Sequence, residues 1–170
     1  ESFLDEAQAV AVGEIGMDLY WDKTFLKQQQ EAFHLQIEWA KKRRLPIVIH
    51  CRDAFDAVFE VLESHKGPLL RGIFHCFTGD LSQANRAISL GMKLGIGGVL
   101  TFKNGGLDRF IDQIDLSHLV LETDAPYLAP VPYRGKRNTS AYLPLVAERL
   151  ALLTGKSLED LAAITTENSK

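Results

Sequence analysis

The sequence predicts an α/β fold with parallel strands, and two observations support this prediction. Four short apolar runs lead into acidic residues or histidines, at residues 9–13, 47–49, 72–74 and 119–121. Between these runs lie segments in which apolar residues recur with the period of an amphipathic helix. Short continuous apolar runs are typical of strands buried on both faces, and strands that alternate with helices are typical of a parallel sheet or barrel.

The elements follow from the same periodicities. Residues 92–99, which end in glycines, are expected to add one more strand. Helices are expected over residues 24–44, 106–114, 141–153 and 158–166. Two more are expected, one that Asp53 caps and whose apolar stripe runs to Leu62, and one that begins at Asp80 or Ser82 and is capped at Gly91. Thr24, Asp53 and Ser157 are the expected N-caps of three of them, because their side chains can accept hydrogen bonds from the first helical N–H groups. The chain is therefore expected to form five strand-and-helix units within a single domain, residues 1–170.

Composition limits the function classes. The chain has 170 residues, 46% of them hydrophobic, and a net charge of -3, which is typical of a globular domain. No apolar stretch approaches the roughly 18 to 20 residues that span a bilayer, and the first residues do not resemble a signal peptide. We therefore expect a cytoplasmic protein with no membrane contact and no obligate protein partner. The mildly acidic balance requires any contact with nucleic acid to be local.

The apolar runs lead to side chains that bind divalent metals. Glu14, His50 and His75 directly follow the first three runs, and Asp124 lies three residues after the fourth. Because the carboxyl ends of parallel strands converge, these residues indicate a metal site. The alternative is four unrelated residues satisfied by backbone hydrogen bonds. The two cysteines, Cys51 and Cys76, are expected to be reduced, buried thiols rather than ligands.

Several longer motifs resemble the TatD family of metal-dependent DNases, which is related to the amidohydrolases. The motifs are Glu14–Asp18, Ile49–Ala54, Phe74–Gly79, Glu122–Leu128 and Pro132–Lys136, and the resemblance covers nearly the whole chain. It implies a TIM-type (β/α)8 barrel in which this chain supplies about five C-terminal units, strands 4 to 8. The family begins with a strand that ends in a His-x-His pair, and no such pair occurs in this sequence.

The resemblance also implies roles for the metal-binding residues. Glu14 corresponds to the bridging carboxylate, and His50 and His75 correspond to imidazole ligands. Asp124 corresponds to the last-strand aspartate that binds metal and orients or deprotonates the attacking water, so Asp124 and Glu14 are the expected catalytic residues. Imidazole and carboxylate ligands together accept one or two ions of Mg²⁺, Mn²⁺ or Zn²⁺.

Residues beside these ligands have two competing interpretations. Asp18 and Glu122 are expected to support the metal ligands, although Glu122 is as well explained as an inner barrel residue. Arg52 is expected to bind a substrate phosphate, and a structural ion pair with Asp18 or Asp53 is equally well supported. Tyr20 and Trp21 could stack on the bases of a single strand or pack into the core.

A basic loop follows the last ligand. Arg134, Lys136 and Asn138 belong to it, and the loops after the last strands of such barrels often hold phosphate groups. We therefore expect these three residues to contact the substrate, and the alternative is a solvated loop.

Three functional hypotheses follow. The first is a metal-dependent phosphodiesterase that hydrolyses single-stranded or duplex DNA with a metal-activated water. The second keeps the metal site but hydrolyses a small amide, ester or lactone, as the related amidohydrolases do. The third is a non-catalytic fragment that self-associates or binds a partner, because the missing first strands would leave open sheet edges.

Overall fold

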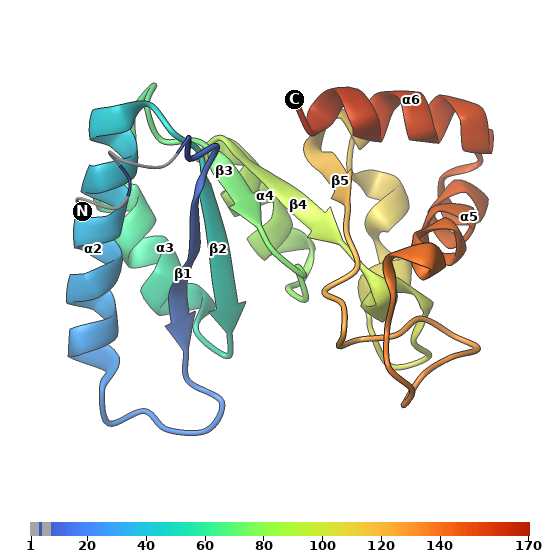
Figure 1. The fold of residues 1–170 in the computed structure, drawn as a ribbon, viewed down its shortest axis with the longest axis horizontal. Coiled ribbons are helices and arrows are strands. Elements are labelled where there is room, and N and C mark those ends of the chain that lie inside the picture. The colour runs from blue at the N-terminus through green and yellow to red at the C-terminus, as the bar shows by residue number, and fades with distance from the viewer. Residues whose placement is uncertain (1–3, 5–7) are drawn as a thin grey trace. The chain divides into compact units, whose positions relative to one another are not determined.

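The structure is a computed structural model that describes Leu4 and residues 8–170. The chain divides into two compact units (Figure 1). The first unit comprises residues 1–75 and 86–92, and the second comprises residues 76–85 and 93–170. Helix α4 (Leu81–Ser89) has residues in both.

The first unit contains three parallel strands. They are β1 (Val12–Asp18), β2 (Ile47–Arg52) and β3 (Gly72–Phe74), in the order β1-β2-β3. Helices α2 (Leu26–Arg43) and α3 (Phe55–Ser64) pack against these strands, and Figure 1 shows them beside β1 and β2. This arrangement confirms the predicted α/β fold with parallel strands.

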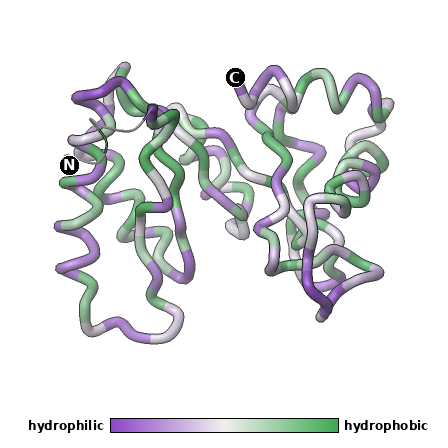
Figure 2. Tube along the Cα trace, viewed as in Figure 1, coloured by the Kyte–Doolittle hydropathy of each residue, from purple (hydrophilic) through white to green (hydrophobic). Residues whose placement is uncertain are grey.

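The core of this unit is built from the predicted apolar positions. Phe33 and Ile37 of α2 and Phe59 of α3 are fully buried, as is Ile49 of β2. In Figure 2 the trace of β2 is green in its first half and turns purple toward its carboxyl end. The strand thus has an apolar body, which holds it in the core, and a polar end.

Strand β1 differs from its prediction. It begins at Val12 rather than at residue 9, and Val10 is 84% exposed. The pairing with β2 shifts between Val12 and Ile15, so Glu14 lies at an irregularity inside the strand and not after its end. The strand begins where a partner is available, because Val12 pairs with Ile47 at the first residue of β2.

Two of the three predicted N-caps are wrong. Helix α2 begins at Leu26 without a side-chain cap, and Thr24 instead donates its backbone N–H to Asp22 Oδ1 at 2.7 Å. Helix α3 begins at Phe55 after Ala54, while Asp53 adopts a left-handed φ of 53°. The third is confirmed, since Ser157 Oγ accepts from the N–H of Asp160 at 3.1 Å.

The second unit contains two parallel strands and most of the irregular structure. Strand β4 (Met92–Ile96), whose first residue is counted with the first unit, pairs with β5 (Leu119–Leu121). Helices α5 (Leu143–Thr154) and α6 (Leu158–Asn168) pack against each other and against β5. None of the helices among the described residues is long and apolar enough to cross a membrane.

Short 3₁₀ turns replace two of the expected elements in this unit. The strand expected over residues 92–99 ends at Ile96, and residues 98–101 form a 3₁₀ turn. The helix expected over residues 106–114 is two 3₁₀ turns, Leu107–Arg109 and Ile111–Gln113. Two further turns lie at Leu116–His118 and Ser140–Tyr142.

Gly98 allows a close approach between two loops of the second unit. A Cβ at this position would lie 1.9 Å from the carbonyl oxygen of Leu128, which belongs to the segment after the last strand. No side chain tolerates that distance, so a larger residue must displace the backbone of that segment.

We predict that Gly98→Ala lowers the free energy of unfolding by about 1 to 3 kcal/mol, because the backbone at Leu128 must move. Gly67→Ala is the matched control, since a Cβ added at Gly67 would meet no atom within 4 Å, and it should change stability by less than about 1 kcal/mol. Urea unfolding of both variants measures the difference. Equal midpoints would contradict the close approach.

Candidate metal centre

Three of the four predicted ligands come together within the first unit. The carboxylate of Glu14 has one oxygen toward each of two imidazoles: Oε2 lies 3.9 Å from His50 Nδ1, and Oε1 lies 3.9 Å from His75 Nε2. The side chains of Glu14 and His50 are 53% and 39% exposed, whereas that of His75 is 12% exposed. Solvent and small ions can therefore reach the Glu14 carboxylate.

The distances in this cluster suit a shared cation better than direct hydrogen bonds. At 3.9 Å the nitrogen and oxygen atoms are too far apart for a hydrogen bond. Two atoms that each bind one cation at about 2.0 to 2.2 Å can be up to about 4.3 Å apart. A carboxylate that faces a different imidazole with each oxygen can also bridge two cations. The donor set therefore fits one or two divalent metal ions.

Asp18 orients the first of these imidazoles. Its Oδ2 lies 3.1 Å from His50 Nε2, so the proton of a neutral His50 ring is held at Nε2. The Nδ1 lone pair is then available on the side that faces Glu14. A carboxylate that fixes the tautomer of a ligating histidine is a common supporting contact in metal sites.

Asp18 is itself held as a carboxylate. Burial raises the pKa of the Asp18 carboxyl, but the hydrogen bond from the N–H of Tyr20 and the nearby His50 ring outweigh this effect. The net pKa lies below the ordinary value for aspartate. Asp18 therefore stays ionised at neutral pH and can keep accepting the His50 proton.

Gln29 of α2 fixes the backbone of Asp18, and sequence reasoning missed it. Its Oε1 accepts from the N–H of Asp18 at 2.9 Å, and its Nε2 donates to the Asp18 carbonyl at 3.2 Å. The only signal in the sequence is a run of three glutamines at residues 28–30. Spacing alone could not have shown which of them reaches the end of β1.

Neither Cys51 nor Cys76 forms a disulfide, as predicted, and Cys51 is poorly suited to bind metal. Cys51 is buried, and burial raises the pKa of its thiol to about 12. The thiol form therefore predominates at neutral pH, whereas metals bind the thiolate. Cys76 is only partly buried, which differs from the expectation that both would be buried.

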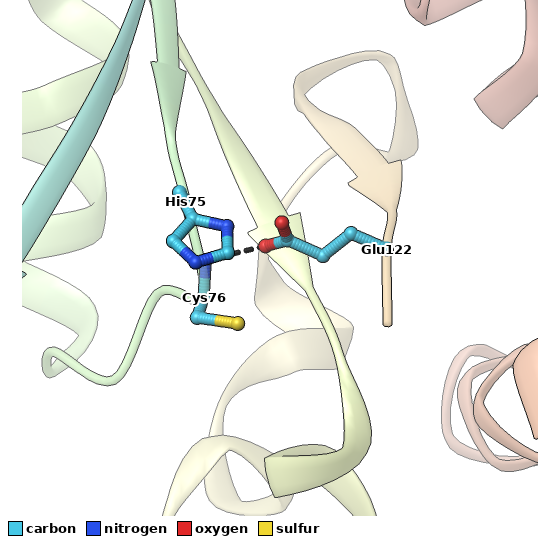
Figure 3. A group of neighbouring side chains, drawn as sticks. All are labelled: His75, Cys76 and Glu122. Carbon is cyan, nitrogen blue, oxygen red and sulfur yellow. Dashed lines mark hydrogen bonds between the residues drawn. The ribbon is translucent and has the colours of Figure 1, made fainter. Parts of the chain in front are cut away.

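Glu122 supports the chain at the residue after His75. In the second unit its Oε1 accepts a hydrogen bond from the backbone N–H of Cys76. Figure 3 draws this pair together with His75, the residue that precedes Cys76 in the chain. The bond holds the backbone N–H of Cys76, and the role of Glu122 as a support for the metal ligands stays a prediction.

Asp124 belongs to a loop of the second unit that Asn138 holds in place. Asp124 has a left-handed φ of 54°, and its carbonyl accepts from the N–H of Tyr127 at 2.7 Å. The buried Asn138 amide donates to the carbonyls of Thr123 and Tyr127, both at 2.6 Å. Asn138 thus ties the two ends of this turn together. Its side-chain amide is used inside the protein, so it can affect a substrate only through the loop.

Two of the basic residues that were predicted to contact substrate stack on aromatic rings. Arg52 places its guanidinium carbon 3.7 Å from the centroid of the Tyr20 ring in the first unit. In the second unit, the guanidinium carbon of Arg134 lies 4.4 Å from the centroid of the Phe102 ring. Lys136 is exposed on the same loop as Arg134. These cations are accessible, and two of them are ordered by stacking.

Comparison with known proteins shows the family. The model for the TatD related DNase family matches residues 1–170. An uncharacterized metal-dependent hydrolase of Bacillus subtilis, YabD, is 42% identical over 96% of this chain and 64% of its own length. The 3'-5' ssDNA/RNA exonuclease TatD of Salmonella typhimurium is 35% identical over 98% of this chain and 66% of its own length.

A solved structure gives the same result. The crystal structure of YJJV, a TatD homologue from Escherichia coli K12, matches with a TM-score of 0.90 and 34% identity, and the match covers 96% of this chain and 63% of that one. The chain thus spans less than two thirds of the length of these three relatives. With motifs, parallel strands and relatives in agreement, the chain belongs to the TatD-related DNases, a family of metal-dependent hydrolases.

Proposed function

We propose that this chain is part of a metal-dependent phosphodiesterase that hydrolyses nucleic acid. The observation that carries the proposal is the Glu14 carboxylate, with one oxygen 3.9 Å from each of two imidazole nitrogens. The name of the Salmonella relative, a 3'-5' ssDNA/RNA exonuclease, supports a nucleic-acid substrate. When bound, a divalent cation supplies a hydroxide nucleophile near neutral pH and offsets the charge of the phosphodiester.

The residues of this chain would divide the remaining work. Glu14, His50 and His75 would hold the metal, and Asp18 would keep the proton of His50 on Nε2, so that Nδ1, which faces Glu14, could bind the metal. Asp124 remains a prediction from the family resemblance, as a further ligand and as the acceptor of the proton from the attacking water. The proposal that these strands are strands 4 to 8 of a (β/α)8 barrel agrees with the share of the relatives' length that the chain covers.

Removal of the Glu14 charge is the direct test. We predict that Glu14→Gln lowers the hydrolysis of a single-stranded oligonucleotide in Mg²⁺ or Mn²⁺ by about a hundredfold or more. Both carboxylate oxygens, each of which faces one imidazole, are needed to bind the metal. Cleavage is measured by gel electrophoresis, with a chelator as the second arm.

Glu60→Gln is the matched control, since Glu60 is an exposed glutamate of α3. It should leave cleavage unchanged. If neither the parent protein nor the control cleaves DNA or RNA with Mg²⁺, Mn²⁺ or Zn²⁺, the proposed function is wrong. A folded protein that also binds no metal would favour the non-catalytic alternative.

Asp18→Asn tests the orientation of His50 separately. The carboxylate accepts from both Tyr20 N–H and His50 Nε2–H, whereas an asparagine side chain has a single acceptor oxygen for these two donors. We predict that metal affinity falls about 10- to 100-fold, measured by calorimetric titration with Zn²⁺ or Mn²⁺. Asp22→Asn, in the loop that follows β1, should bind as the parent protein does. Equal affinities for the two variants would remove Asp18 from the metal site.

A small amide, ester or lactone is the competing substrate class, and the basic loop separates it from nucleic acid. We predict that Arg134→Ala combined with Lys136→Ala raises KM for an oligonucleotide and flattens its salt dependence by about 1.4 in log–log slope, since each phosphate contact on a single strand contributes about 0.7. Hydrolysis of a small neutral ester should be unaffected by the same variant. Lys156→Ala, an exposed cation elsewhere in the second unit, is the control.

A further inference from the structure

The loop after β1 exposes two large aromatic rings beside the candidate metal centre. Trp21 is 82% exposed and Tyr20 is 50% exposed, although rings of this size are usually buried. The residue before them, Leu19, is buried and donates its N–H to the carbonyl of Arg52 at 2.9 Å. The loop is therefore anchored to β2 while its two rings remain in solvent.

Arg52 orders these rings. Its guanidinium carbon lies 3.7 Å from the centroid of the Tyr20 ring and 5.8 Å from that of Trp21. The two rings meet edge to face, with centroids 4.6 Å apart and planes at 89°. We call Tyr20, Trp21 and Arg52 the aromatic platform. Because its groups are already packed on one another, a ligand that stacks on it loses less of its binding energy to ordering side chains.

One carboxylate connects this platform to the candidate metal centre. Asp18 Oδ1 accepts from the N–H of Tyr20 at 2.9 Å, and its Oδ2 lies 3.1 Å from His50 Nε2. On β2, His50 and Arg52 are two residues apart, so their side chains leave the same face of the strand. A ligand on the platform would therefore lie beside the group that binds at His50.

We infer that the aromatic platform is a stacking site for an unpaired nucleobase of the nucleic acid whose phosphodiester is hydrolysed at the metal centre. This inference rests on the proposed function and adds the residues that recognise the substrate. Exposed aromatic faces stack on any base, and a neighbouring guanidinium suits both the π-system and the phosphate. In a duplex the faces of the bases are covered by their neighbours, so the platform selects single-stranded ends.

The affinity for an oligonucleotide tests the inference without turnover. In a Glu14→Gln background, the affinity for a short single strand is compared with that for the same strand in which the bases are replaced by abasic sites. Trp21→Ala should weaken binding of the normal strand about tenfold, as expected for the loss of one stacked base. The Glu14→Gln protein should bind the abasic strand correspondingly more weakly than the normal strand. Trp21→Ala should not lower the affinity for the abasic strand any further.

Two further variants make the measurement specific. Trp21→Phe keeps an aromatic face and should recover most of the affinity. Phe25→Ala removes another exposed ring, 55% exposed, four residues further along the chain, and should change nothing. In a Trp39→Phe variant Trp21 is the remaining tryptophan, and its fluorescence should be quenched by the normal strand and not by the abasic one.

The outcomes separate this inference from the function on which it rests. If the parent protein with Glu14 cleaves oligonucleotides but Trp21→Ala binds and cleaves them equally well, the stacking site is wrong and the proposed function stands. Additive losses from Trp21→Ala and from the abasic strand would also overturn it, because the ring would then act elsewhere than on a base. If the parent protein neither binds nor cleaves nucleic acid, both fail together.

Discussion

The hydrogen bonds at Asp18 organise the polar ends of β1 and β2. Its two carboxylate oxygens have different partners, the N–H of Tyr20 and the ring of His50, and its backbone is held by Gln29 from α2. The imidazole tautomer and the course of the following loop therefore depend on one side chain. Because the pKa of Asp18 lies below the ordinary value, its carboxylate stays charged at neutral pH and can accept from both Tyr20 and His50.

The parts of the fold that sequence could predict are those decided by local patterns. Ile47 and Ile49 are buried, and their strand appears where the apolar run predicts it. The start of β1 could not be predicted in this way, since its pairing with β2 begins at Val12, opposite Ile47, and the apolar residues 9–11 precede this pair. Likewise, Asp53 has the residue type of an N-cap, but its left-handed backbone removes it from that position.

The residues of the candidate site also divide into those that local patterns predict and those that they do not. Residue types that bind metal identified Glu14, His50 and His75, and the structure brings them together in one unit. Asn138 was expected to contact substrate because it follows basic residues, but its amide bonds Thr123 and Tyr127, which are 15 and 11 residues away in the chain. Such contacts depend on how a loop folds back, and no local spacing encodes that. Gln29 escaped prediction for the same reason.

Alternation along β2 explains how a reactive site can coexist with a buried strand. His50 is 39% exposed and Arg52 is exposed, whereas Ile49 and Cys51 point into the core. The same strand end therefore presents an imidazole to solvent and keeps a thiol in the core, where burial raises the pKa of that thiol to about 12. A shift of one residue would exchange these faces and present Cys51 in place of His50. The apolar half of the strand fixes the register, and the register decides which chemistry faces the solvent.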